Sequence, residues 1–228
     1  AMLGLEERLG ARSSLYFLER TGQRMDARYD WRQDRFGPLF KRLREGGWEV
    51  GLHGSYDSAR DERMLAAQRR RLAEASGGPV VGVRQHYLRF LVQDGWRRQQ
   101  EAGFQYDTTL GFADDVGFRG GLARPFQPFD LIARRKLDLW EVPLIIMDQT
   151  FRSYLGLPID RVWERALPVL ERVKAHRGAA AILWHNTFFA GYKFAGYEKV
   201  YARIIEWVKE NGGTCTTAQA IVAQWERR

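Results

Sequence analysis

Short apolar runs alternate along the chain with longer stretches in which apolar residues recur every three or four positions. The first pattern is typical of strands buried in a parallel sheet, and the second of helices that cover such a sheet. Strands are predicted at 12–18, 48–52, 80–83, 106–108, 140–147, 179–184 and 214–216. Helices are predicted at 34–45, 60–75, 92–102, 158–176 and 197–209, and in the last residues up to about 225.

This alternation indicates an α/β protein with roughly seven strands. Gly46-Gly47 and Gly77-Gly78-Pro79 follow the first two long helical patterns as stop signals, and Pro158 opens a later one. A barrel is favoured over an open doubly wound sheet, because no glycine-rich phosphate loop follows any predicted strand. The 228 residues fit a single domain, 1–228.

Composition and charge narrow the class of protein. No apolar run approaches the ~18 residues of a membrane span, and the single cysteine, Cys215, excludes an internal disulfide framework. We therefore expect a soluble, cytoplasmic protein with no membrane partner. The net charge of +8 does not predict nucleic-acid binding, because the basic residues are interleaved with acidic ones. Only 69–71 and 134–136 form dense basic clusters.

Polar residues follow three of the apolar strands at their carboxyl ends. These residues are His53, Arg84 and His185. In barrels of this kind the functional residues lie where the strands pass into loops at that end. The coincidence of three such residues with three strand ends predicts a site there.

His53 stands in the segment GLHGSYDS, four residues before Asp57. Nitrogen and oxygen ligands at this spacing suit zinc if the loop folds as a helical turn. A lone His after an apolar strand is more often structural, and Asp57 or Ser58 can instead cap the helix that starts near Arg60. The sequence favours neither interpretation of Asp57, metal ligand or helix cap, over the other.

Arg84 ends an apolar strand in GVRQHY, where a guanidinium suits a carboxylate or another anionic group. The alternative is a salt bridge at the barrel rim, and His86 faces the same side if the chain stays extended. His185, after the strand that ends in ILW, suits general acid work near neutral pH, although a structural role is equally compatible with the pattern.

The segment 110–135 has no clear periodicity and is rich in Gly, Pro and Phe. Phe118 and Arg119 stand within it among other aromatic and charged residues. Aromatic faces beside hydrogen-bonding groups suit sugar rings. An equally compatible interpretation is a loop whose aromatic residues plug the barrel mouth.

Five pieces in sequence, GLHGSYDS, GVRQHYLRF, YDTTLGFADDVGFRGG, WEVPL and ILWHNTFF, resemble a bacterial subgroup of the polysaccharide deacetylases over nearly the whole chain. The resemblance implies a distorted (β/α) barrel that hydrolyses N- or O-acetyl groups of glycans with a divalent metal, usually zinc. It implies that His53 is a metal ligand and that Arg84 tethers the catalytic Asp. It also implies that His185 protonates the leaving group, while Trp184 and Leu183 line the acetyl pocket.

Two departures from the family pattern change these expectations. Asp57 replaces the second metal His, and the family's first strand, with its two aspartates, is not found in the chain, which begins in the helix after it. We expect a barrel of about seven parallel strands, weak or absent zinc binding and impaired deacetylation of an acetylated glycan or amino sugar. The alternative is a non-catalytic carbohydrate-binding barrel. A helix, a loop or a second copy of the chain is expected to cover the open edge beside 12–18.

Overall fold

The computed structural model describes residues 1–227, which divide into two compact units. The main-sheet unit consists of Ser14–Leu110, Pro125–Val142 and the chain from Thr217 onward. The β8–β9 unit consists of Ala1–Ser13, Gly111–Arg124 and Pro143–Thr216. The single domain expected from the sequence stays a prediction. In the described residues no helix is both long and apolar enough to cross a membrane.

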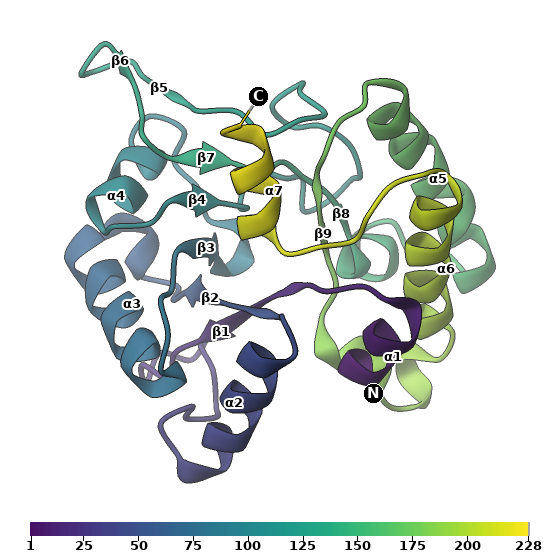
Figure 1. The fold of residues 1–228 in the computed structure, drawn as a ribbon, viewed down its shortest axis with the longest axis horizontal. Coiled ribbons are helices and arrows are strands. Elements are labelled where there is room, and N and C mark those ends of the chain that lie inside the picture. Colours follow the sequence, from purple (N-terminus) through teal and green to yellow (C-terminus); the bar gives the residue numbers. More distant parts are fainter. Residues whose placement is uncertain (228) are drawn as a thin grey trace. The chain divides into compact units, whose positions relative to one another are not determined.

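Five parallel strands form the main sheet, in the order β1, β2, β3, β4 and β7 (Figure 1). They are β1 (Ser14–Leu18), β2 (Glu49–Gly54), β3 (Gly82–Gln85), β4 (Tyr106–Asp107) and β7 (Trp140–Glu141). Leu52, Val83 and Tyr106 are completely buried in it. Burial of both faces explains why β2 and β3 appear in the sequence as continuous apolar runs. The α/β class with parallel strands is therefore confirmed, and closure into a barrel stays a prediction.

The helices of the main-sheet unit follow its strands. They are α2 (Gly37–Glu45), α3 (Glu62–Ser76), α4 (Gly95–Glu101) and α7 (Ala218–Trp225). The first three lie along one side of the sheet in Figure 1. Gly77, with a φ of 67°, ends α3 in the left-handed conformation that favours glycine, as the stop signal predicts.

Strand β1 has a strand neighbour on one side only among the described residues. The N–H of Leu18 donates to the hydroxyl of Tyr29 at 3.1 Å, in the segment that follows the strand. At the other end of β1, Ser14 Oγ accepts the N–H of Ala218, the first residue of α7, at 2.8 Å. The loop thus satisfies one backbone N–H of β1, and a side-chain contact ties the start of the strand to α7.

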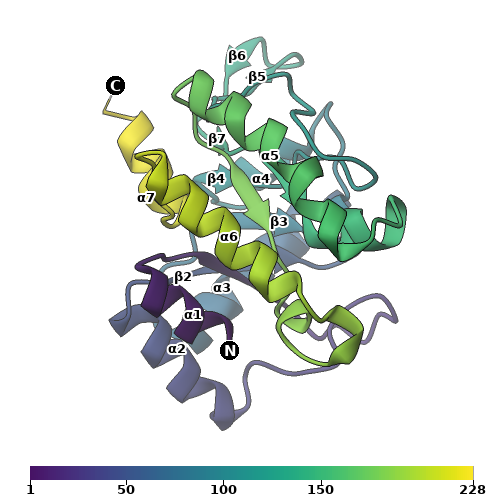
Figure 2. The same ribbon diagram turned by 90° about the vertical axis from the view of Figure 1, so that its right-hand side faces the viewer.

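The β8–β9 unit holds a second parallel pair, β8 (Leu144–Met147) and β9 (Ala181–Leu183), with Met147 opposite Leu183. The helices α5 (Ile159–Ala175) and α6 (Tyr197–Glu210) pack beside each other, and α1 (Met2–Leu9) packs on α6 (Figure 2). A single turn of π-helix, Thr150–Tyr154, follows β8. The buried core of this unit includes Ile146, Phe151, Val162, Ala166, Leu170 and Ile204.

The predicted strand 140–147 is interrupted, which corrects the sequence analysis. Val142 still donates to the carbonyl of Asp107 beside β7, at 2.9 Å. Pro143 has no N–H and cannot continue a ladder in both directions. The chain therefore forms the two strands β7 and β8, which belong to different sheets.

The strand predicted at 214–216 is not formed. Two β-branched threonines favour a strand by composition, yet this stretch lacks a repeating ladder. Its backbone contact is a bond from the N–H of Arg12 to the carbonyl of Cys215, at 3.1 Å. The helix predicted at 92–102 is shorter than expected, since α4 begins at Gly95.

Candidate functional site

His53 and Arg84 lie side by side on neighbouring strands of the main sheet. They are register partners of β2 and β3, so the two strand-end residues are neighbours in this unit, and their membership of one functional site stays a prediction. His53 Nδ1 is 2.7 Å from the carbonyl oxygen of Arg84. Because a carbonyl oxygen only accepts, Nδ1 carries the proton and Nε2 is the basic nitrogen of this imidazole.

Arg84 is a buried cation with few partners. The residue is 7% exposed. Its Nε–H donates to the carbonyl of Thr108 at 3.2 Å, and its guanidinium carbon lies 4.5 Å from the ring centre of Tyr16. Within residues 1–227 it makes no ion pair, so the rim salt bridge considered for it is not formed. A guanidinium with most donors unused suits an anionic group.

A network of buried polar groups lies beside Arg84 at the amino ends of β1, β2 and β4. Glu49 accepts hydrogen bonds from the hydroxyls of Ser14 at 2.5 Å and Tyr106 at 2.7 Å, and Tyr16 donates to Tyr106 at 3.2 Å. Burial raises the pKa of the Glu49 carboxyl. Burial also raises the pKa of Tyr16 to about 12, although the charge of Arg84 acts in the opposite direction. Sequence reasoning missed this network, because its members are spread over three strands.

His86 lies beyond Arg84 and contacts both His53 and an acidic residue. Its ring centre is 5.0 Å from that of His53, and its Nδ1 is 3.6 Å from Asp26 Oδ1. Asp26 is 8% exposed and accepts the N–H of Tyr56 at 2.8 Å. His86 therefore lies beside His53, one of the strand-end residues. Asp26 was missed, since it lies in a segment with no periodic pattern.

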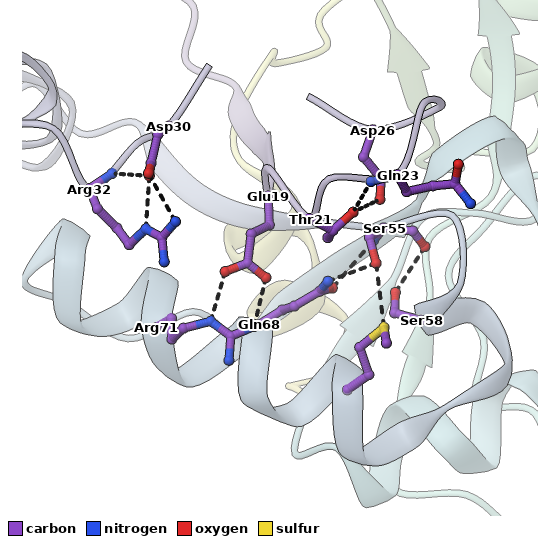
Figure 3. A network of polar contacts seen from close by, with 11 residues as sticks. Glu19, Thr21, Gln23, Asp26, Asp30, Arg32, Ser55, Ser58, Gln68 and Arg71 are labelled. Atoms are coloured by element: carbon purple, nitrogen blue, oxygen red, sulfur yellow. Dashed lines mark hydrogen bonds and ion pairs between the residues drawn. The ribbon is translucent and has the colours of Figure 1, made fainter. Parts of the chain in front are cut away.

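The segment that follows β1 is tied to the rest of this unit by polar side chains (Figure 3). Glu19 receives two hydrogen bonds from Arg71 of α3, each 2.7 Å long. Thr21 donates to Asp26 Oδ2 at 2.5 Å, and the side chain of Gln68 donates to Ser55 Oγ at 2.7 Å. These bonds fix the segment that carries Asp26 and the loop that follows β2, the strand of His53.

Asp57 does not cap α3, which corrects one of its two interpretations; it precedes a short 3-10 helix, Ser58–Arg60, without a side-chain cap bond. The N-terminal cap of α3 is Asp61, whose side chain accepts the N–H of Met64 at 2.9 Å. Ser58 Oγ donates instead to the carbonyl of Ser55 at 3.0 Å. Asp57 is exposed, and its carboxylate is 3.4 Å from the amide nitrogen of Gln23.

The described residues do not fit the expected metal site. A protein zinc site needs at least three ligands. Nowhere in residues 1–227 do three His, Cys, Asp or Glu side chains gather closely enough to hold a metal ion. His86 faces Asp26, and Asp57 is turned toward Gln23. Among the described residues, His53 and Asp57 thus belong to no group of three possible ligands.

Two buried carboxyl groups form a further pair in the main-sheet unit. Asp107 and Glu141 are register partners of β4 and β7, and both are completely buried. Glu141 accepts the indole N–H of Trp96 at 2.8 Å and the N–H of Leu110 at 3.2 Å. Burial raises the pKa of Glu141 well above its ordinary value, and the neighbouring Asp107 carboxylate raises it further. The pair therefore keeps one proton up to a higher pH than two free carboxyl groups do.

His185 follows β9 in the other unit, where it forms a close pair with Asp148. His185 Nδ1 is 2.7 Å from Asp148 Oδ1, and the backbone N–H of His185 donates to Asp148 Oδ2 at 2.6 Å. The Asp148 side chain is completely buried, whereas that of His185 is 38% exposed. An ionised carboxylate only accepts, so it fixes the Nδ1–H tautomer and leaves Nε2 as the basic nitrogen of His185.

Sequence reasoning missed Asp148, although a signal for it was present. It is the first residue after β8, just as His185 follows the end of β9. The same rule that selected His53, Arg84 and His185 selects Asp148, because the predicted strand 140–147 already ends at Met147.

The four other predicted residues of this unit have different surroundings. Leu183 is buried in β9. Trp184 packs on α6, with its ring centre 5.5 Å from that of Tyr201, and Phe118 packs on the same core. Arg119 is exposed and donates to the carbonyl of Gly111 at 3.3 Å. Their roles in substrate binding stay predictions.

Comparison with known proteins gives a fold but no sequence family. No protein-family model and no curated protein sequence matches the chain. A structure described as a polysaccharide deacetylase from Mycobacterium smegmatis matches with a TM-score of 0.66 at 16% identity, over 98% of this chain and 76% of its own. A polysaccharide deacetylase structure from Pseudomonas aeruginosa PAO1 matches with a TM-score of 0.67 at 15% identity, over 100% and 72%.

An allantoinase structure matches equally well, with a TM-score of 0.67 at 17% identity, over 99% of this chain and 71% of its own. At such identities a likeness shows the fold. The chain has the α/β fold of the polysaccharide deacetylases, as its sequence resemblance implied.

Proposed function

We propose that this chain is a deacetylase-type hydrolase of acetylated glycans in which His185 is the proton donor. The pairing of His185 with the buried Asp148 carries the proposal. Fold neighbours described as polysaccharide deacetylases support the reaction class and the glycan substrate. Membership of that family, and of its bacterial subgroup, is part of the same proposal.

The pair has the geometry of an oriented general acid. Asp148 accepts a hydrogen bond from the Nδ1–H of His185 and stabilises the imidazolium that forms when Nε2 takes up a second proton. The exposed side of the imidazole then delivers that proton to a leaving amine or alkoxide. General acid catalysis of this kind contributes typically ~10²–10⁴ in rate.

Hydrolysis by this chain is proposed to be impaired. A deacetylase of the expected type activates its water with a divalent metal, and the described residues gather no group of three ligands. Zinc binding through His53 and Asp57 alone is therefore proposed to be weak or absent. No step of the proton transfer by His185 depends on that metal.

A second candidate is a non-catalytic carbohydrate-binding protein, and the lack of a three-ligand group in residues 1–227 favours it. Such a protein keeps the fold and binds glycan through residues such as Phe118 and Arg119. In both candidates the chain is proposed to form a distorted (β/α) barrel, which fold matches over 98% and 100% of this chain support.

Acetate release separates the two candidates. Acetylated chitooligosaccharides and acetylated xylan are incubated with the chain, with and without added zinc, and binding is measured by calorimetry in parallel. We expect slow release that falls to background in His185→Ala and persists in His176→Ala. His176, at the exposed end of α5, is the matched control. Binding without release favours the second candidate, and neither binding nor release contradicts both.

Metal analysis tests the impairment. After dialysis against a weak chelator, zinc is expected well below one equivalent per chain, and His53→Ala should not change it. One full equivalent that disappears in His53→Ala would show a metal site that the described side chains do not form. One full equivalent that survives in His53→Ala would exclude His53 as a ligand.

A further inference from the structure

An unbroken run of six exposed residues, 131–136, forms the tip of a hairpin that the proposed function does not use. The strands β5 (Phe129–Asp130) and β6 (Arg135–Lys136) pair antiparallel on either side of the turn. Leu131 is 78% exposed and Ile132 70%. The hairpin stands away from the main sheet in both ribbon views (Figures 1 and 2). Two large aliphatic side chains side by side at a projecting tip indicate a contact surface.

The tip is held in one conformation without a partner. Asp130 is 4% exposed, and its Oδ1 accepts the N–H groups of Ile132 at 2.8 Å and Ala133 at 3.0 Å. Behind the strands, the N–H of Leu137 donates to the carbonyl of Pro128 at 2.8 Å. The exposure of Leu131 and Ile132 is thus built into the hairpin, and docking would order few additional residues.

The same tip carries three cations in sequence, Arg134, Arg135 and Lys136, all exposed. None of them is within ion-pair distance of a carboxylate in the described part of the chain. The carboxylate opposite Arg135 in the hairpin register, Asp130, is already engaged with two backbone N–H groups. Asp130 also lies 3.5 Å from Arg97 Nε and interacts electrostatically with Arg135. The tip 131–136 itself carries three cations and no carboxylate beside its aliphatic surface.

We propose that this hairpin tip docks on an anionic lipid surface, with Leu131 and Ile132 in the boundary between headgroups and acyl chains. Arg134, Arg135 and Lys136 lie among the lipid phosphates. Aliphatic residues beside cations are the composition of interfacial membrane anchors. A polyanion such as a nucleic acid would leave Leu131 and Ile132 in water. A stable protein interface needs ~1,000 Å² or more, which two aliphatic side chains on a projecting turn do not supply.

This proposal differs from the sequence expectation of no membrane partner. That expectation rested on the lack of a spanning apolar run, and a surface-bound hairpin requires no such run. The proposal is independent of the hydrolase assignment, because its residues take no part in the proton transfer by His185.

Vesicle co-sedimentation of the full chain tests the proposal. Vesicles of phosphatidylcholine alone are compared with vesicles that also contain phosphatidylglycerol. Each cation near an anionic surface is worth about fivefold in partitioning, so Arg135→Gln/Lys136→Gln should reduce binding roughly 25-fold. Leu131→Ser/Ile132→Ser should reduce it at least about tenfold. Tyr192→Ser, which changes a side chain 96% exposed on the other unit, is the control and should bind as wild type does.

Three results would overturn the proposal. The first is no sedimentation of the wild-type chain with either vesicle. The second is binding that survives Leu131→Ser/Ile132→Ser but falls with the charge variant, because that pattern is adsorption by net charge alone. The third is a concentration-dependent dimer in ultracentrifugation that Leu131→Ser/Ile132→Ser abolishes, which would assign the tip to a second copy of the chain. Circular dichroism of each variant verifies that it is folded.

Discussion

The buried carboxyl pair of β4 and β7 makes the stability of this protein depend on pH with a defined sign. Folding places Asp107 and Glu141 opposite each other with no exposed surface on either residue. Burial and the neighbouring carboxylate raise the pKa of Glu141 well above its ordinary value, and burial raises the pKa of Asp107. Above the ordinary Glu pKa of ~4.3, the unfolded chain releases a proton that the folded pair keeps.

The free energy of unfolding therefore falls as the pH rises toward the folded pKa of the pair. One retained proton corresponds to about 1.4 kcal/mol per pH unit. Glu141→Gln removes this proton while its amide oxygen can still accept the Trp96 N–H. Urea denaturation between about pH 5 and about pH 7 should thus show a flatter profile for Glu141→Gln than for wild type. Subtracting the two profiles cancels other titrating groups such as Glu49.

Asp138→Asn is the matched control, since it removes an exposed carboxylate three positions before Glu141. Its pH profile should run parallel to that of the wild type. Parallel profiles for wild type and Glu141→Gln would refute the reasoning, because they would show that no proton is retained on folding.

Three further substitutions test the environments of charged residues through the free energy of unfolding. Arg84→Met should leave stability unchanged or raised, because it replaces a buried cation that makes no ion pair in residues 1–227, and a loss of ~3 kcal/mol or more would reveal a carboxylate partner. Asp61→Ala should lower stability by about 1 kcal/mol through loss of the α3 cap, whereas exposed Asp57→Ala should change it by less than ~0.5 kcal/mol. The reverse order of the two Asp variants would restore Asp57 as the cap.

Apolar patterning predicted the strands that are buried on both faces of the main sheet. The strands that carry His53 and Arg84 are of this kind and appear as apolar runs in the sequence. Their parallel pairing places the two residues in register. This part of the candidate site could be inferred because strand ends in a parallel sheet share an edge.

Other features depend on which of several similar residues makes a contact, and the apolar pattern of the sequence does not indicate this. Asp57, Ser58 and Asp61 are all residues that favour N-caps, and the structure selects Asp61 because α3 begins at Glu62. One proline separates β7 from β8 and sends them to different sheets. An apolar run that contains a proline is therefore better predicted as two strands.

The buried partners were the least predictable part of the site. Glu49 and Tyr106 are far apart in sequence and bond at 2.7 Å, and a single sequence carries no record of such a contact. The strand-end rule also selects Asp148, but the sequence analysis assigned no site residue after the predicted strand 140–147. The metal site, the substrate contacts and the barrel closure stay predictions.

The leaving-group dependence of hydrolysis tests the role of His185 most directly. A general acid is needed when the leaving group is an amine or an alkoxide and is hardly needed for 4-nitrophenolate, which leaves without a proton. His185→Ala should slow acetate release from chitooligosaccharides by ~10²–10⁴ relative to its effect on 4-nitrophenyl acetate. Asp148→Asn, which removes the positioning carboxylate, should show a smaller difference of ~10–100-fold.

The measurement is the rate of acetate release from chitooligosaccharides divided by the rate of 4-nitrophenyl acetate hydrolysis, in wild type, His185→Ala and the His176→Ala control. Of the two variants, only His185→Ala should lower this ratio, because its defect is confined to substrates whose leaving group requires a proton. Equal slowing of both substrates in His185→Ala would contradict the assignment of His185 as the proton donor, because a general structural defect affects both reactions alike.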